Sequence, residues 1–116
     1  MKAAVTYGSV YTADLSGPRR GTEAGKVRPV LVMQTNLLSA TGHPSTFVLP
    51  CTTRSTGESI LRVELPKGIV GNTSACEIMI DQGRAIGHGR FRKRLGVLPR
   101  GLLTEVQRKL RQLLEL

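Results

Sequence analysis

The chain has 116 residues, which suits one domain and leaves little room for a second, so we expect residues 1–116 to form a single domain. Seventeen Lys and Arg stand against eight Asp and Glu, and this net charge of +9 indicates a polyanionic partner, either nucleic acid or an acidic protein. No stretch is long and apolar enough to cross a membrane, and the N-terminus lacks the apolar run of a signal peptide, so we expect a cytoplasmic location.

The predicted elements are mostly short strands followed by one terminal helix. Strands are expected where apolar and β-branched residues alternate or run together, and loops where Gly, Pro and polar residues cluster. The expected strands are 8–15, 29–34, 46–51, 60–65 and 85–89, whereas 76–81 is either a strand or a short helix and 36–44 is a loop. Short strands with turn signals between them favour a mainly β fold, in the form of a small barrel.

The C-terminal segment has the pattern of an amphipathic helix. Its apolar residues recur at helical spacing, with Lys, Arg and Gln mostly on the other side, and Pro99 stands near its start, where a missing N–H costs nothing. The apolar positions are Leu102, Leu103, Val106, Leu110, Leu113 and Leu114. We expect this helix to seal the core; the alternative is a helix that binds a partner.

A glycine-rich, charged loop delivers one arginine to the start of an apolar strand. Pro29 follows Arg28 directly and biases it toward an extended backbone, so Arg28 is held at a fixed position at the entry of the strand. The planar fork of a guanidinium binds phosphate oxygens bidentately. Arg28 is therefore either a phosphate ligand or a surface arginine that closes a loop, paired with Glu23.

Thr52 and Thr53 end the strand predicted at 46–51, and their side chains point to opposite faces because side chains alternate along a strand. Threonine is also an ordinary strand residue, so a purely structural role is the alternative. If the strands carrying Arg28 and Thr52 are antiparallel neighbours, both residues lie at one end of the sheet. A guanidinium and a hydroxyl would then share one pocket that fits a scissile phosphate.

No metal or cofactor site is expected from the remaining candidate ligands. His43 and His88 stand singly and are expected to be exposed, although their spacing does not exclude a paired-histidine ribonuclease. Cys51 and Cys76 have neither a metal-binding spacing nor a CxxC motif, so a reduced, buried pair is expected.

Basic residues cluster in two places along the chain. The run Arg90–Arg94 is either a solvated sheet edge that discourages pairing or a surface that steers a polyanion. The other basic residues are expected near the entrance of the pocket that contains Arg28, and they are Arg19, Arg20, Lys26 and Arg54.

Four segments, taken in order, resemble the MazF/PemK toxins: 8–15, 21–32, 48–53 and 81–86. The resemblance covers nearly the whole chain. It implies an SH3-like small β-barrel of the MazF/CcdB type, mainly β with helices and closed by a C-terminal helix, in a protein that is usually a homodimer. It also implies an enzyme: the toxin of a type II toxin–antitoxin system, which cleaves single-stranded RNA (mRNA) at specific sequences without a metal and is neutralised by a MazE-like antitoxin.

The resemblance carries particular roles onto this sequence. Arg28 and Thr52 match the two principal catalytic positions, and Glu23 matches a loop acid that supports activity or substrate binding. The positions assigned to RNA binding are Arg19, Arg20, Lys26, Thr53, Arg54, Gln82 and Arg84. Ser9 stands where many relatives have Asp and Ala24 where many have Gln, which bears on cleavage preference more than on the reaction.

Two other functions fit parts of this pattern. A CcdB-like poison that binds DNA gyrase and cuts nothing has the same kind of barrel, but such a protein needs no phosphate cradle. A non-catalytic RNA-binding module is supported by the charge alone.

Overall fold

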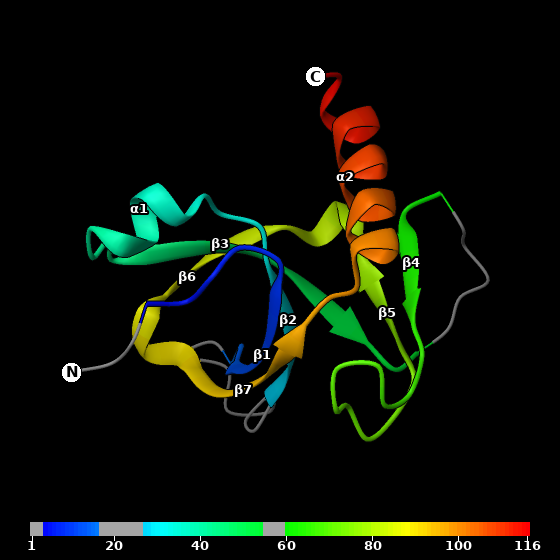
Figure 1. Cartoon of the computed structure of the whole chain (residues 1–116), viewed down its shortest axis with the longest axis horizontal. Coiled ribbons are helices and arrows are strands. Elements are labelled where there is room, and N and C mark those ends of the chain that lie inside the picture. Colours follow the sequence, from blue (N-terminus) through cyan, green and yellow to red (C-terminus); the bar gives the residue numbers. More distant parts are fainter. Residues whose placement is uncertain (1–3, 17–26, 55–59) are drawn as a thin grey trace.

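The computed structural model describes residues 4–16, 27–54 and 60–116, in which seven strands pair into one antiparallel sheet and two helices flank it (Figure 1). The elements are β1 (Ser9–Asp14), β2 (Val27–Val32), α1 (Asn36–Ala40), β3 (Ser45–Thr52), β4 (Arg62–Leu65), β5 (Cys76–Met79), β6 (Arg84–Gly87), β7 (Phe91–Val97) and α2 (Arg100–Leu114), with short 3-10 turns at η2 (Ile80–Gln82) and η3 (His88–Arg90).

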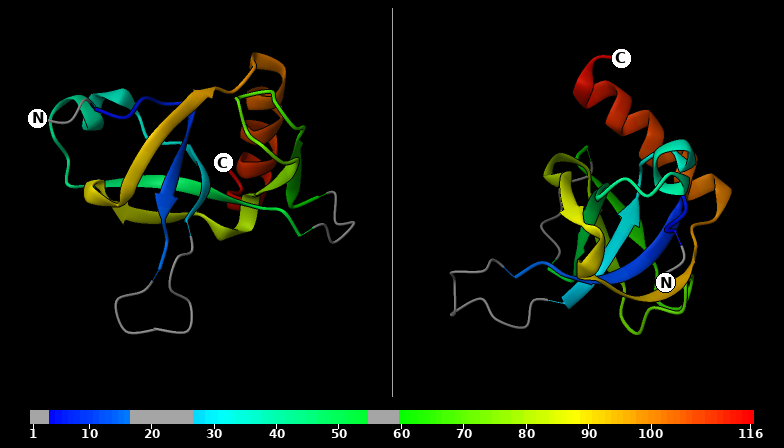
Figure 2. Two further views of the ribbon diagram at one scale, coloured as in Figure 1. Left: turned by 90° about the horizontal axis from the view of Figure 1, so that it is seen from below. Right: turned by 90° about the vertical axis from the view of Figure 1, so that its left-hand side faces the viewer.

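The strand order is β4-β5-β3-β2-β1-β7, and β6 pairs with the first half of β3. Strand β3 is therefore central, because it pairs with β2, β5 and β6. The sheet curls strongly, as the two views of Figure 2 show. Within the described residues, no pairing joins β4 to β7, so the prediction of a mainly β fold with a C-terminal helix is confirmed without the expected closure into a barrel.

Both faces of the central strands are buried, which explains their nearly continuous apolar sequence. Val30 and Val32 of β2 pack with Val48 in one hydrophobic cluster, whereas Leu31 and Leu49 belong to a second cluster on the other face. All five side chains are fully buried. Alternation along β2 and β3 therefore supplies both cores.

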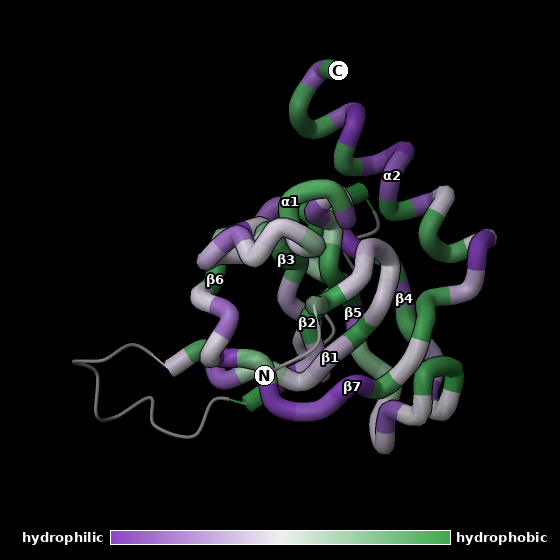
Figure 3. The backbone as a smooth tube through the Cα atoms, turned by 60° about the vertical axis from the view of Figure 1, so that its left-hand side comes forward, coloured by the Kyte–Doolittle hydropathy of each residue, from purple (hydrophilic) through white to green (hydrophobic). Residues whose placement is uncertain are grey.

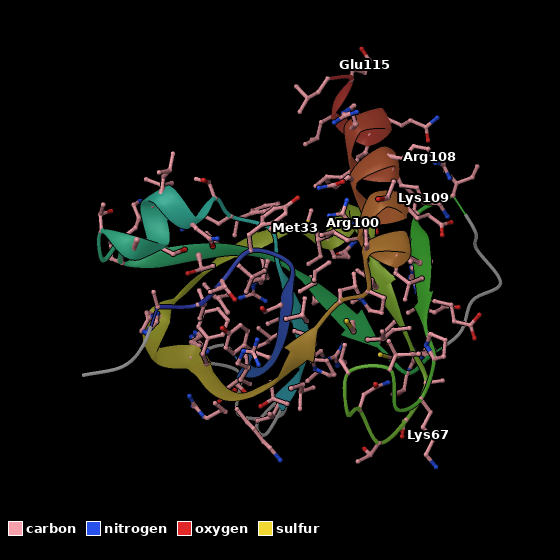
Figure 4. All side chains as sticks on the ribbon, in the orientation of Figure 1. Met33, Lys67, Arg100, Arg108, Lys109 and Glu115 are labelled. Carbon is pink, nitrogen blue, oxygen red and sulfur yellow. The ribbon has the colours of Figure 1, made fainter. Side chains whose placement is uncertain are left out.

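Helix α2 seals the second of these clusters, as expected. Leu102, Leu103, Val106 and Leu110 pack against it, and Lys109, on the side that faces β4, donates from Nζ to the carbonyl oxygen of Arg62 at 2.9 Å (Figure 4). The C-terminal end of α2 projects beyond the sheet (Figures 1 and 3), where Leu113 and Leu114 are exposed. None of the helices in the described residues is long and apolar enough to span a bilayer.

One expectation about local structure was wrong, and one open alternative was decided. The segment 36–44 was expected to be a loop but begins with α1, because the Thr35 hydroxyl caps the helix by accepting from the Leu37 N–H at 3.2 Å. This helix has no buried residue, so no apolar periodicity marked it. The basic run Arg90–Arg94 was expected to be either a solvated sheet edge or a surface that steers a polyanion. Most of it lies in β7, which pairs with β1 at the edge of the sheet, in agreement with the first alternative.

Other boundaries differ by a few residues. The segment 76–81 contains both expected alternatives, a strand followed by a 3-10 turn. The strand expected at 60–65 is confirmed for Arg62–Leu65, with Val63 and Leu65 buried and Glu64 exposed.

Gly83 marks a close approach between η2 and β3 that tests the packing of the core. A Cβ at this position would overlap the tip of the Phe47 ring and come within 3.2 Å of the Leu49 side chain. We expect Gly83→Ala to lower the free energy of unfolding by about 1–3 kcal/mol, because the ring has to leave its packed position. Urea unfolding at a fixed protein concentration measures this change.

Gly87→Ala is the matched control, because no heavy atom lies within 4 Å of a Cβ built there. Its free energy of unfolding should stay within about 0.5 kcal/mol of the parent value. Equal unfolding midpoints for the two variants would contradict the packing described around Gly83.

Candidate functional site

Strands β2 and β3 are antiparallel neighbours, which confirms the placement expected for Arg28 and Thr52. The observed register pairs Val30 with Pro50 and Leu31 with Leu49. Carried two residues further, this register sets Arg28 opposite Thr52, because β2 begins where β3 ends. On its other side, Arg28 pairs with Ala13 of β1.

A pocket of about 230 Å³ lies at this end of the sheet. The residues that line it are Val27, Arg28, Pro29, Cys51, Thr52, Thr53 and Cys76. Arg28 and Thr52 are half-buried and Thr53 is exposed, whereas both cysteines are buried. The pocket thus combines one guanidinium with two hydroxyls.

The Thr52 hydroxyl is oriented by the backbone that follows it. Its Oγ1 accepts a hydrogen bond from the Arg54 N–H at 3.1 Å. A hydroxyl has one hydrogen to donate, and this contact uses only its acceptor capacity. The Thr52 O–H can therefore donate to an oxygen of a ligand in the pocket.

The charge of Arg28 is not neutralised within the described residues, where no carboxylate forms an ion pair with it. Across the strands from Thr52 stands an acid, Glu77 of β5. Its carboxylate binds Arg62 at 3.1 Å, in an ion pair whose two side chains are less than a fifth exposed. The pocket therefore retains a positive charge that suits an oxyanion.

The two cysteines affect one another as well as the pocket. A hydrogen bond with Cys76, together with burial, raises the pKa of the Cys51 thiol well above its usual range, although the Arg28 charge acts in the opposite direction. The same hydrogen bond lowers the pKa of the Cys76 thiol, and burial opposes that shift. Both cysteines are free, as the sequence predicted.

Two larger cavities, of about 540 and 400 Å³, lie on another part of the surface, around Val5 and His88. His43 and His88 both line the larger one, but none of its lining residues is Lys or Arg. His43 is exposed, as expected, and its Nδ1 lies 2.8 Å from the Ser45 carbonyl oxygen, whereas His88 is half-buried and its ring packs near that of Phe91. The cavity of about 400 Å³ is lined by Arg92 and Arg94, of which Arg92 is paired with Asp14. The smaller pocket differs in joining the Arg28 guanidinium to the hydroxyls of Thr52 and Thr53, which suits phosphate chemistry.

Comparison with known proteins decides the family. The model of the PemK-like, MazF-like toxins of type II toxin–antitoxin systems matches residues 6–114. The chain belongs to this family. This match does not favour the gyrase-binding alternative.

Individual relatives agree with this assignment. The probable endoribonuclease MazF of Mycolicibacterium smegmatis is 32% identical over 104 residues, which cover 89% of this chain and 90% of that protein. In the solved structures, MazF of the Deinococcus radiodurans MazE–MazF complex (Form-II) has a TM-score of 0.82 at 24% identity and covers 99% of both chains. The Mycobacterium tuberculosis toxin MazF-mt6 has a TM-score of 0.75 at 18% identity and covers 93% of this chain and 97% of its own. At these identities the structures show a shared fold.

The structure brings together only some of the residues predicted for the site. Arg28, Thr52 and Thr53 share the pocket, and Arg54 follows them as an exposed residue. Four of the predicted residues lie outside the described residues: Arg19, Arg20, Glu23 and Lys26.

Gln82 and Arg84 are exposed but do not line the pocket. Arg84 pairs with Val48, and Val48 pairs with Val32, so Arg84 lies level with the far end of β2 from Arg28. If these two residues bind RNA, they contact a part of it that lies away from the pocket.

Sequence reasoning missed that the two cysteines belong to the site. Cys51 could have been found, because it directly precedes Thr52 at the same strand end. Cys76 could not, because its place depends on the pairing of β5 with β3, which no local pattern encodes.

Proposed function

We propose that this chain is the toxin of a type II toxin–antitoxin system and acts as a sequence-specific endoribonuclease on single-stranded RNA, with mRNA as its substrate. The family match and the relative named as a probable endoribonuclease support the proposal. The observation that carries it is the pocket that combines the guanidinium of Arg28 with the donor hydroxyl of Thr52. A protein that only binds another protein has no need of such a pocket.

The reaction is attack by the ribose 2′-OH on the adjacent phosphorus. The 2′-oxygen forms a bond to phosphorus, the 5′-oxygen of the next nucleotide leaves, and the products are a 2′,3′-cyclic phosphate and a 5′-hydroxyl. This route explains selectivity for RNA and needs no metal or cofactor. Its transition state gathers negative charge on the phosphoryl oxygens, and preorganised donors stabilise that charge.

Arg28 and Thr52 divide this task. Arg28 neutralises the developing charge on the phosphoryl oxygens, because a guanidinium keeps its proton near neutral pH and is a poor proton donor. Thr52 donates its hydrogen to a phosphoryl oxygen or orients the 2′-OH. Glu23 either accepts the 2′-OH proton or holds Arg28 in place.

The remaining expectations belong to the same proposal. The sheet corresponds to the SH3-like barrel of the MazF/CcdB type, the protein acts as a homodimer, and it works in the cytoplasm, where mRNA is found. Its protein partner is a MazE-like antitoxin, as in the Deinococcus radiodurans complex. An acidic tail of such an antitoxin would compete with RNA for the basic residues around the pocket.

The first prediction tests catalysis itself. Purified protein, incubated with a long unstructured RNA in EDTA, should give discrete fragments that end in cyclic phosphate. Arg28→Ala should cut about a hundred- to a thousand-fold more slowly, because one preorganised charge donor is lost. Fragment yields on gels measure the rate, and circular dichroism checks the fold.

Each outcome of this assay has a distinct meaning. A mobility shift of the RNA without fragments would identify a non-catalytic RNA binder. If neither a shift nor fragments are seen, the gyrase-binding alternative is favoured. Full activity in folded Arg28→Ala would remove Arg28 from the mechanism.

The second prediction concerns the hydroxyl of Thr52. Thr52→Val keeps the shape and the β-propensity but removes the donor, so we expect a loss of about a hundredfold in single-turnover rate with little change in RNA affinity. Thr52→Ser keeps the hydroxyl and should retain most of the rate.

Thr53→Val makes the same chemical change one residue along the chain. We expect it to weaken RNA binding more than the cleavage step. If Thr53→Val is instead the variant that stops cleavage, the strand register assigned to the site is off by one residue.

The third prediction concerns the basic residues before β2. Arg19→Ala/Arg20→Ala should weaken binding of a 2′-deoxy, uncleavable oligonucleotide and reduce the slope of log affinity against log salt by about 1.4, because two phosphate contacts are lost. Arg108→Ala/Arg111→Ala on α2 removes the same charge and should leave the slope nearly unchanged. Fluorescence anisotropy across a salt series measures both slopes, and equal slopes for the two variants would place the RNA elsewhere.

A further inference from the structure

Two buried thiols lie side by side next to the residues proposed for catalysis. Cys51 pairs across the strands with Ile78, and Cys76 stands two residues before Ile78 on β5. Residues two apart on a strand point to the same face, so the two cysteines are diagonal neighbours. Both belong to the same hydrophobic cluster, and both line the pocket of Arg28 and Thr52.

The two thiols are neighbours but differ in reactivity. Their interaction, together with burial, raises the pKa of Cys51, and the same interaction lowers the pKa of Cys76 against the opposing effect of burial. The thiolate is the form that attacks an oxidant, so Cys76 is the more nucleophilic of the pair. Cys51, held as a thiol beside it, is placed to react second.

We propose that Cys51 and Cys76 are a redox modification site: a hydroperoxide converts them into a reversible intramolecular disulfide, and this bond distorts the adjacent pocket. The first half of the proposal stands on the geometry of the two thiols. The second half, that oxidation stops RNA cleavage, rests on the function proposed above.

The chemistry proceeds in two balanced steps. Cys76 attacks one oxygen of hydrogen peroxide, its thiol becomes a sulfenic acid, and one water leaves. The sulfur of Cys51 then attacks the sulfur of that sulfenic acid, the S–O bond breaks, the S–S bond forms, and a second water leaves. The two thiols together lose two electrons and two protons, and the peroxide is reduced to two waters. A low-molecular-weight dithiol reverses the change by thiol–disulfide exchange.

The disulfide would act on the pocket through the ends of two strands. Diagonal neighbours have Cα atoms about 7–8 Å apart, whereas a disulfide joins Cα atoms no more than about 6.8 Å apart. Closing the bond therefore draws the end of β3 toward β5, and Thr52 is the next residue after Cys51. A displacement of about 1 Å in a catalytic group is enough to cost about a hundredfold in rate.

The experiment compares reduced and peroxide-treated full-length protein by two independent readouts. Intact mass after alkylation, with peptide mapping, measures the Cys51–Cys76 disulfide. Cleavage of the same RNA in EDTA measures the activity. We expect the oxidised protein to carry the intramolecular disulfide, to cleave about a hundredfold more slowly, and to regain its rate after dithiothreitol.

Single substitutions separate the roles of the two cysteines, with each variant compared before and after peroxide. After peroxide treatment, Cys76→Ser should cleave RNA as fast as the same variant does before treatment, because the remaining Cys51 thiol is unreactive. This variant still contains the half-buried Met33 and Met79, so it also controls for methionine oxidation. Cys51→Ser should stop at the sulfenic acid, which dimedone traps as an adduct on Cys76.

The outcomes that overturn the proposal are distinct. Peroxide-treated protein that oxidises without forming the intramolecular disulfide refutes the modification site. A complete disulfide with an unchanged cleavage rate, or equal inhibition of Cys76→Ser, refutes its effect on the pocket. If the reduced protein itself does not cleave RNA, the proposed function fails, and the mass readout still decides whether the disulfide forms.

Discussion

The register between β2 and β3 is the constraint on which the site depends. Both strands bury both of their faces. A slip of one residue between β2 and β3 would therefore move each apolar side chain of the slipped strand from one hydrophobic cluster to the other. The same slip would turn Thr52 away from Arg28 and bring Cys51 in its place. Core packing thus fixes the site geometry, because the residues proposed for catalysis continue the strands that the core holds in register.

The electrostatics of the pocket follow from which charges are paired and which are not. Glu77 lies opposite Thr52 and would repel a phosphate, but Arg62 holds its carboxylate in a largely buried ion pair. Arg28 has no such partner in the described residues, so its charge faces the pocket. A choice of site by cavity volume would select a different part of the surface, since the two larger cavities lie elsewhere. The combination of the Arg28 guanidinium with the Thr52 and Thr53 hydroxyls, and not size, marks the smaller pocket as the candidate phosphate site.

Sequence patterns predicted the elements whose burial is periodic and missed those whose burial is not. The continuous apolar runs predicted β2 and β3, and leucine spacing predicted α2, because in each case side chains at regular positions are buried. Helix α1 buries nothing, and β7 is an edge strand whose Arg92, Lys93 and Arg94 are exposed, so neither carries an apolar signal. The placement of Arg28 beside Thr52 was predicted on the condition that their strands are antiparallel neighbours, which the pairing of β2 with β3 fulfils. The approach of Cys76 was not, because it depends on which strand lies beside β3.

Cys51 shows how closely core and site are joined. Its side chain packs in the cluster sealed by α2, and the next residue along β3 presents a hydroxyl to the pocket. An aliphatic residue at Cys51 would pack as well, but it would not exchange a hydrogen bond with Cys76 or carry redox chemistry. Because Cys51 and Thr52 are consecutive residues, a shift of the backbone at Cys51 also shifts the backbone of Thr52. The end of β3 therefore carries packing on one face and chemistry on the other, and whatever changes the bonding of the two thiols changes the pocket as well.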